Sequence, residues 1–511
     1  MQFSSVRFLL FAAVLLILYY WVPGKLQWAV LLAASVCFYV EAGPHYLAFL
    51  LFTALSTYIC TVRMAHNRAQ LTQKAQRSQE TAVKKKNRFL LILCLTGNFS
   101  LLLLCKACLT EPFRTAVAGR CISFLSLGLP LGISFYMFQS MGYCMDVYRG
   151  TIEAEQNFGK LALFVSYFPQ LIQGPISRFS QLAPQLFTVH RFDGKQLSFG
   201  LQRMLWGYFK KLVIADRIAV AVAALKGPEY TGVSFLVLSF FYAVQIYSDF
   251  TGGMDIALGL SQALGITLPE NFTHPFFSKN IAAYWRRWHI TLGTWMKDYL
   301  FYPLSVCRSM RRFSRFARQR LGSFGKRLPV YAASAVTWFV TGIWHGLTPN
   351  FIVWGLLNCF VIVVSEELSP LYKRFHSRFH LNKAPWYGSF EILRTFLLMN
   401  LIRACDLFPN VGDYFRRIGS LFTRLNLHVL WGGTLMGLGL SLLDYCILAA
   451  GVGLMFTVSL IQKKKGSIRE WLWQENTAVR YALNFALLLA VLLMGNYGIG
   501  YRAASFIYNQ F

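Results

Sequence analysis

Long apolar runs recur along most of the chain, and they are the strongest structural signal in the sequence. Residues 8–21, 47–62 and 483–494, for example, contain no charged side chain. With their flanks, such runs reach the roughly 20 residues that an α-helix needs to cross about 30 Å of hydrocarbon. The pattern therefore predicts an all-α polytopic membrane protein, with spans near residues 6–22, 26–42, 44–62, 89–109, 122–147, 201–224, 233–249, 329–348, 350–367, 389–404, 433–461 and 480–499.

Two stretches do not fit simple crossing helices. Residues 158–190 carry three prolines within apolar sequence, and residues 251–303 mix apolar residues with glycines, prolines, histidines and arginines. Irregular or polar backbone at membrane depth survives only where protein buries it or where it lines a wet cavity. We therefore expect both stretches to form re-entrant or interfacial pieces around a central chamber.

Composition supports lipid as the solvent. The 511 residues are 56% hydrophobic and only 14% charged, whereas soluble chains are typically about 45–50% apolar and about 25% charged. The first apolar run is followed at once by two more, which is not the pattern of a cleaved signal peptide. We expect a multi-pass protein of the cell membrane.

The net charge of +29 does not indicate a nucleic-acid partner, because the basic residues cluster beside apolar runs. Residues 63–88 hold eight Lys/Arg against one acid, and residues 307–327 hold eight with no acid. Such clusters are the positive-inside signal, with added attraction for anionic lipid head groups. The predicted loops 63–88, 307–327, 370–388 and 462–478 then face the cytoplasm, and both chain ends face outward.

Several kinds of catalytic or binding site are absent from the sequence. No phosphate-binding loop, dinucleotide fingerprint, serine nucleophile elbow or His-Glu-x-x-His zinc helix is present. His376 and His380 have metal-ligand spacing but no carboxylate or cysteine nearby, so we predict no metal. The eleven cysteines are scattered, and even the close pair Cys105 and Cys108 lies at the end of a span, which does not favour redox chemistry.

Ionisable residues within apolar spans are costly and therefore point to function. His345 lies in Trp344-His345-Gly346, toward the far end of the span 329–348. An imidazole suits proton transfer near neutral pH, although a helix-packing histidine is an equal alternative on this feature alone. His289 ends a Trp-Arg-Arg-Trp-His cluster at 285–289, for which an interfacial aromatic and arginine belt is the competing interpretation.

Asp249 is a third candidate, with Asp255 six residues further on. Either carboxylate could pair with Arg286 or Arg287, or it could orient a catalytic imidazole. The residue pattern alone leaves both interpretations open.

The segment 247–304 resembles the signature region of membrane-bound O-acyltransferases, in the branch that contains alginate O-acetyltransferase and related bacterial polysaccharide acetylation proteins. It runs from Tyr-Ser-Asp-Phe through Trp-Arg-Arg-Trp-His to Tyr-Pro-Leu. The blocks 129–150, 168–186, 342–355 and 506–511 are similar to the same branch and follow in the same order. The resemblance covers most of residues 129–367 and the end of the chain.

This resemblance implies one membrane domain over residues 1–511, with N-terminal helices at 1–128, a signature core at 129–367 and C-terminal helices at 389–511. It also implies roughly 10–13 transmembrane helices around a central funnel and tunnel. His345 matches the family's catalytic histidine and His289 its second motif histidine. Supporting roles in substrate binding are expected for Trp344, Trp288, Arg286, Arg287, Asp249, Asn271 and Asn358.

Two positions depart from the family pattern. Residues 252–255 read Gly-Gly-Met-Asp where relatives have Gly-Tyr-Ser-Asp, and Asn358 stands where many relatives carry histidine. Both changes leave the two principal histidines intact. They put the choice of acceptor or partner in doubt rather than the reaction.

The expected reaction is acyl transfer, most simply of acetyl, from a cytoplasmic thioester to a hydroxyl of an extracytoplasmic polysaccharide or peptidoglycan. Acetyl-CoA or an acyl-carrier-protein thioester would be the donor, with no bound cofactor, and an SGNH-type esterase-like protein would be the partner. A D-alanyl transferase acting on teichoic acid is the alternative within the family. A polysaccharide transporter or flippase is the alternative from another class, since transporters also have polar re-entrant segments.

Overall fold

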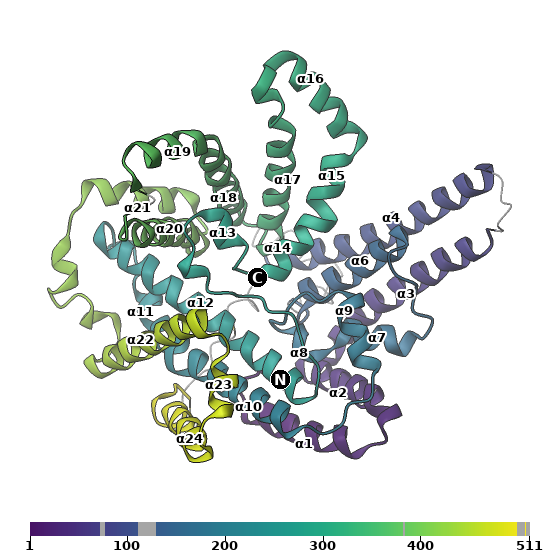
Figure 1. The fold of residues 1–511 in the computed structure, drawn as a ribbon, viewed down its shortest axis with the longest axis horizontal. Coiled ribbons are helices and arrows are strands. Elements are labelled where there is room, and N and C mark those ends of the chain that lie inside the picture. The colour runs from purple at the N-terminus through teal and green to yellow at the C-terminus, as the bar shows by residue number, and fades with distance from the viewer. Residues whose placement is uncertain (72–76, 111–128, 382–383, 498–505, 507–511) are drawn as a thin grey trace, which may run out of the picture. The chain divides into compact units, whose positions relative to one another are not determined.

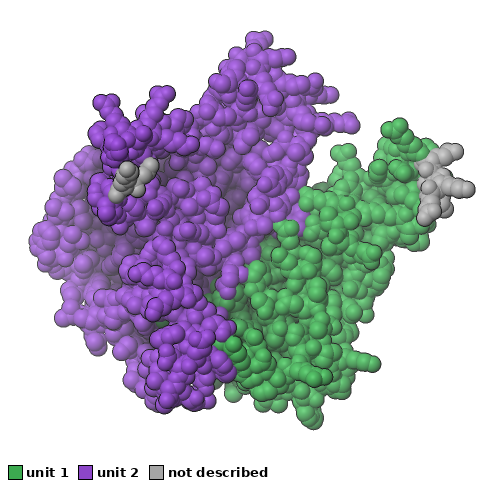
Figure 2. Space-filling model, in the orientation of Figure 1, with its two compact units in different colours: residues 1–207, 253–269, 505–511 green, residues 208–252, 270–504 purple. Residues whose placement is uncertain are grey.

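A computed structural model describes residues 1–71, 77–110, 129–381, 384–497 and 506. Helices make up its regular structure, and only one isolated β-bridge occurs among the described residues (Figure 1). The contacts group the chain into two compact units. Unit 1 comprises residues 1–207, 253–269 and 505–511, and unit 2 comprises residues 208–252 and 270–504 (Figure 2). The prediction of a single domain stays a prediction.

Unit 1 contains the N-terminal helices, and an aromatic cluster lies at their core. The rings of Phe3 and Phe8 are 4.7 Å apart, and those of Phe38 and Phe168 are 5.1 Å apart. Helices α3 and α4 lie side by side (Figure 1). The helices are α1 (Val6–Trp21), α2 (Gln27–Ala42), α3 (Leu47–Ala69), α4 (Arg77–Ala107), α6 (Ile133–Arg149), α7 (Phe158–Ser166), α8 (Phe168–Leu171), α9 (Phe179–Phe187) and α10 (Gly194–Tyr208).

Unit 2 holds most of the signature region and the C-terminal helices. The helices before the signature histidines are η3 (Phe209–Ala215), α11 (Asp216–Ala224), η4 (Pro275–Phe277) and α13 (Ile281–Trp285). Those that follow are α14 (Ile290–Met296), η5 (Lys297–Phe301), α15 (Tyr302–Val306), α16 (Arg308–Gly325), α17 (Leu328–His345), α18 (Pro349–Glu367), α19 (Ser369–Arg378), α20 (Tyr387–Arg403), η7 (Ala404–Leu407), α21 (Val411–Thr423), α22 (Leu442–Lys465), α23 (Ile468–Gln474) and α24 (Thr477–Met494).

Seven helices among the described residues are long and apolar enough to cross a membrane, and α1 is a shorter apolar helix. The seven are Gly24–Ala42, Pro44–Ala69, Arg77–Ala107, Val233–Ala263, Pro349–Glu367, Leu442–Lys465 and Thr477–Met494. Large apolar side chains are exposed along the last of them, as expected where lipid rather than water is the solvent. The fold is therefore that of an all-α, multi-pass membrane protein.

Besides the span 6–22, which corresponds to the shorter helix α1, four predicted spans lack this combination of length and hydropathy: 122–147, 201–224, 329–348 and 389–404. Charged residues explain two of them, because α20 contains Glu391 and Arg394, and the helical stretch across η3 and α11 contains Lys211 and Asp216. The first part of the span 122–147 lies outside the described residues, as do 498–499 of the last span and 507–511 of the C-terminal block.

The structure corrects two boundaries. The helix α12 (Val233–Ala263) is 31 residues long. It does not end near residue 249 but continues through Gly252 and Gly253, so the irregular stretch begins after residue 263. The basic segments predicted as loops are largely helical: α3 and α4 extend into 63–88, and α16 occupies most of 307–327. Arginine, lysine and alanine are good helix formers, so a basic segment beside a span often continues as helix.

Candidate functional site

His345 is the last residue of α17 and is only 5% exposed. Its ring meets the rings of Trp344 and Trp354 nearly edge-on, with centroids 4.9 and 4.8 Å away. The ring of Phe351 lies parallel to it at 6.5 Å. The imidazole therefore packs among aromatic rings.

Small residues allow α17 and α18 to approach closely beside His345. A Cβ added at Gly342 would lie 2.6 Å from the carbonyl oxygen of Phe351, and one at Gly355 would lie 2.4 Å from that of Trp338. Small residues have this role wherever two membrane helices pack backbone to backbone. The two glycines therefore help to fix the end of α17, and with it His345, against α18.

His289 precedes α14 as its N-cap and has a left-handed backbone conformation, with φ of 49°. A non-glycine residue with positive φ is uncommon and persists where the surroundings determine it. Here an antiparallel β-bridge joins Phe272 and Trp288, and the N–H of Ile290 donates to the carbonyl of Asn271 at 3.0 Å. The short strand-like pairing therefore holds the residues on either side of His289.

Asn271 fixes the orientation and tautomer of the His289 ring. Its Oδ1 accepts hydrogen bonds from the backbone N–H and the hydroxyl of Thr291, at 2.9 and 3.0 Å. The amide nitrogen Nδ2 then faces Nδ1 of His289 at 3.2 Å. Because an amide NH₂ group can only donate, Nδ1 accepts and the ring proton lies on Nε2. In this tautomer Nε2 carries the ring proton and can act only as a donor.

Burial keeps the His289 imidazole neutral. The side chain lies outside the candidate spans and is 3% exposed. Loss of hydration is the larger cause and the positive charge of Arg403 the smaller one, and together they lower the pKa of His289 to about 3. A neutral Nε2–H donor is therefore present throughout the physiological pH range.

Trp344 joins the two histidines. It is adjacent to His345 in sequence, and its ring lies 5.9 Å from that of His289, at an interplanar angle of 70°. The indole is 6% exposed. The structure thus packs the two predicted catalytic residues against one buried tryptophan.

The other predicted amide, Asn358, anchors the tryptophan cluster to α18. Its Oδ1 accepts a hydrogen bond from the indole N–H of Trp285 at 3.2 Å, and its Nδ2 donates to the carbonyl of Trp354 at 2.8 Å. Trp288 is 1% exposed and stacks on Tyr284 at 5.6 Å. Trp288 and Asn358 therefore belong to the same packed site as the histidines.

The predicted arginines are not part of this buried site. Arg286 is exposed, and the half-buried Arg287 donates to the carbonyl of Phe277 at 3.3 Å. The proposed pairing of Asp249 or Asp255 with these arginines is wrong. Asp249 pairs instead with Lys211 at 2.7 Å in unit 2, because the π-helical turn η3 directs that ammonium toward α12.

Within unit 1, the carboxylate of Asp255 pairs with Arg203 at 2.9 Å. In unit 2, Lys211 also lies 2.9 Å from Asp216, and all three side chains of the Asp216–Lys211–Asp249 group are almost fully buried. The sequence interpretation missed Lys211 although it lies inside the predicted span 201–224. A charge within an apolar span was the signal that could have found it.

Arg403 and Asp406 were missed as well. Their side chains form an ion pair at 3.3 Å and are each 5% exposed. Arg403 lies near the end of the predicted span 389–404, and Asp406 follows that span. The two residues are three apart, which is the spacing of a helical ion pair. Burial raises the pKa of the Asp406 carboxyl to about 6, and Arg403 opposes that rise.

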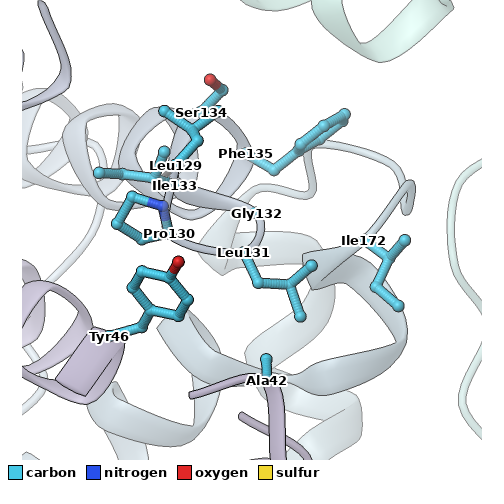
Figure 3. Close-up of a pocket in the computed structure, with 10 residues that line it drawn as sticks. All are labelled: Ala42, Tyr46, Leu129, Pro130, Leu131, Gly132, Ile133, Ser134, Phe135 and Ile172. Carbon is cyan, nitrogen blue, oxygen red and sulfur yellow. The ribbon is translucent and has the colours of Figure 1, made fainter. Parts of the chain in front are cut away.

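No cluster of three or more His, Cys, Asp or Glu side chains suited to a metal ion occurs in the part of the chain that the structure describes. Unit 1 has a cavity of about 210 Å³, lined mainly by residues 129–135, at the start of the block 129–150 that resembles the family (Figure 3). Ala42, Tyr46 and Ile172 complete its wall, and none of the predicted site residues contributes to it.

The all-helical membrane fold thus holds two motif histidines against one buried tryptophan. A model of the membrane-bound O-acyltransferase family matches residues 155–405, which include both histidines and Arg403. The chain belongs to this family and is an O-acyltransferase.

Individual members of the family are similar to this chain over much of its length. The chain is 34% identical to a probable alginate O-acetylase AlgI of Pseudomonas fluorescens, over 83% of this chain and 76% of the relative. It is 30% identical to the peptidoglycan O-acetyltransferase of Helicobacter pylori, over 77% of each. Identity to the teichoic acid D-alanyltransferase of Bacillus subtilis is 27%, over 48% of this chain and 61% of the relative. These relatives transfer acyl groups to cell-envelope polymers.

Proposed function

We propose that this protein transfers an acetyl group from a cytoplasmic thioester, acetyl-CoA, to the hydroxyl of an acceptor on the outer side of the cell membrane. The observation that carries the proposal is that the rings of His345 and His289 both pack against Trp344. The similarity to alginate and peptidoglycan O-acetyltransferases over more than three quarters of the chain favours acetyl as the group.

The proposed chemistry needs one base and one donor. A thioester is already activated, so the enzyme mainly aligns the two substrates and removes the hydroxyl proton. His345 takes that proton as the acceptor oxygen attacks the thioester carbon. Nε2–H of His289 donates to the oxyanion that forms on the acyl oxygen. When the tetrahedral intermediate collapses, the thiolate leaves, and it takes up the proton from His345.

We further propose that the immediate acceptor is a hydroxyl of an SGNH-type esterase-like partner, which passes the acetyl group to the polysaccharide. The stretch 405–432 is a leading candidate for the largest external segment, and its regular structure is α21 and short helical turns. A segment of this size offers little surface for an extended glycan. Membrane lipids and this partner are the expected neighbours, and the cytoplasmic membrane is the expected location.

The test uses the full-length protein in proteoliposomes, supplied with labelled acetyl-CoA and polymer, with and without the partner. Transfer to the partner followed by transfer to polymer supports the relay. Full transfer to polymer without a second protein contradicts it. Mass spectrometry of surface polymers from a deletion strain identifies the acceptor.

The D-alanyl branch is the second candidate, and the similarity to teichoic acid D-alanyltransferases favours it. That similarity covers less than half of the chain, against 83% for the alginate relative. Loss of D-alanine rather than acetate from the surface polymers of the deletion strain would decide for this branch. The same proteoliposomes would then be active with a D-alanyl carrier protein and inactive with acetyl-CoA.

A further inference from the structure

Arg403 lies among three tryptophans at the end of α20. Its guanidinium carbon is 5.1 Å from the ring centroids of Trp288 and Trp354, and 5.8 Å from that of Trp285. The arginine side chain is 5% exposed. A cation over an aromatic face within about 6 Å is attracted by the ring quadrupole, most strongly where water is excluded. A single desolvated charge therefore holds three rings at once.

Each of these rings belongs to a segment that carries a site residue. Trp288 immediately precedes His289, and the ring of Trp354 meets that of His345 at 4.8 Å. Trp285 connects to α18 through its hydrogen bond with an asparagine of that helix. Through these rings Arg403 contacts the segments of both histidines.

The position of Arg403 is itself fixed on α18. Its ion pair with Asp406 spans the turn η7. The side-chain amide of Asn350, near the start of α18, donates to the carbonyl of Asp406 at 3.1 Å, and the thiol of Cys405 donates to the carbonyl of Asn350 at 3.4 Å. The turn is therefore bonded to the segment that directly follows His345 in the chain.

Stability alone is a weak reason to retain such a pair. Taking two charges out of water costs free energy that their attraction often does not offset. A protein in which apolar residues of similar volume replace a buried ion pair is therefore frequently as stable. A planar guanidinium stacks on aromatic faces and is more weakly hydrated than an ammonium, so it suits a buried position among several rings. The geometry therefore suits a role in aligning the tryptophan rings better than a role in stabilising the fold.

We propose that Arg403 is a positioning residue, which aligns the segments bearing His289 and His345 for the same acyl group by holding Trp288 and Trp354. The inference rests on the proposed acyl transfer. Misplacing a catalytic group by about 1 Å can cost on the order of 100-fold in rate. Loss of the guanidinium is therefore expected to reduce kcat by about 10- to 100-fold, with the KM for the thioester within about threefold of the wild-type value.

The experiment compares Arg403→Lys and Arg403→Met in proteoliposomes, with rates expressed per folded molecule. Arg403→Met removes the charge, whereas Arg403→Lys keeps the charge without the planar group. Both should lose kcat, and Arg403→Lys should retain more. If Arg403→Met does not accumulate in the membrane, Arg403→Lys and Asp406→Asn give the result. Full kcat in the folded variants would overturn the inference.

Arg417 offers a matched control from the same unit. It is 5% exposed, lies 4.6 Å from the ring of Phe408 and donates to the carbonyls of Lys226 and Gly227 at 2.9 and 2.7 Å. Arg417→Lys should lower the melting temperature while leaving kcat per folded molecule unchanged. A purely structural role for Arg403 would give the same pattern at both positions.

The wild-type protein and His345→Gln separate this inference from the proposed function. Wild-type protein without acyl transfer would contradict the proposed function. Active wild-type protein, inactive His345→Gln and fully active folded Arg403→Met would contradict only the positioning role.

Discussion

Replacing His345 separates its chemistry from its packing. His345→Ala removes two edge-to-face ring contacts, with Trp344 and Trp354. Such pairs are worth about 0.5–1.5 kcal/mol each, so packing should cost roughly 1–3 kcal/mol of stability. Loss of a general base costs about 10²–10⁴-fold in rate, or about 3–5 kcal/mol of transition-state stabilisation. The loss of transition-state stabilisation should therefore exceed the loss of folding stability.

The assay measures acetyl transfer per folded molecule together with the melting temperature in detergent. His345→Gln keeps a polar side chain and most of the volume, so it should restore much of the stability and none of the activity. His376 gives a control, because its ring lies 5.0 Å from that of Tyr387 and its Nε2 is 2.6 Å from the Tyr387 hydroxyl. His376→Ala should lose stability without a loss of rate. Transfer within threefold of wild type by folded His345→Gln would refute a catalytic role.

Further outcomes follow from other parts of the molecule. In unfolded chains the His289 ring takes up a proton near pH 6.5, but in the folded protein it does so only near pH 3, so its contribution to stability is complete above pH 6.5 and falls as the pH drops. Relative to His289→Gln, the wild type should lose about 2 kcal/mol of its free energy of unfolding between pH 7.5 and 5. An equal change of stability with pH in the two proteins would contradict this. Lys211→Met should cost about 3–5 kcal/mol of stability, since it removes the buried ammonium that pairs with both Asp216 and Asp249, and a normal yield of stable protein would show that the charge is dispensable. Cysteines placed at the exposed Ser78 and Ser323, in a background without other cysteines, should react with impermeant reagents only after lysis; labelling in intact cells would reverse the topology.

The sequence predicted the membrane class and the two histidines because both signals are local. Apolar runs set the spans, and the Trp-His-Gly and Trp-Arg-Arg-Trp-His motifs each lie within five residues. The extent of α12 was missed because Gly252 and Gly253 were taken to interrupt the helix, although a glycine in a membrane helix can also serve close packing.

Contacts between residues far apart in the sequence could not be predicted from local sequence patterns. Arg286 and Arg287 are adjacent to the tryptophans in sequence, yet Arg403, more than one hundred residues later, is the cation that contacts these rings. Likewise, the partner of Asp249 is Lys211 on another helix. Which arginine lies inside depends on how α20 packs, and no periodicity within a single segment encodes that.

The left-handed backbone of His289 has a consequence for engineering. Glycine and asparagine adopt positive φ more readily than most residues, so either would relieve whatever backbone strain the imidazole now bears there. Under the proposed mechanism, selection for heat resistance and selection for turnover would then favour different residues at one codon. Variants chosen by melting temperature alone would drift toward inactive enzyme, and a consensus-guided library should hold this position fixed.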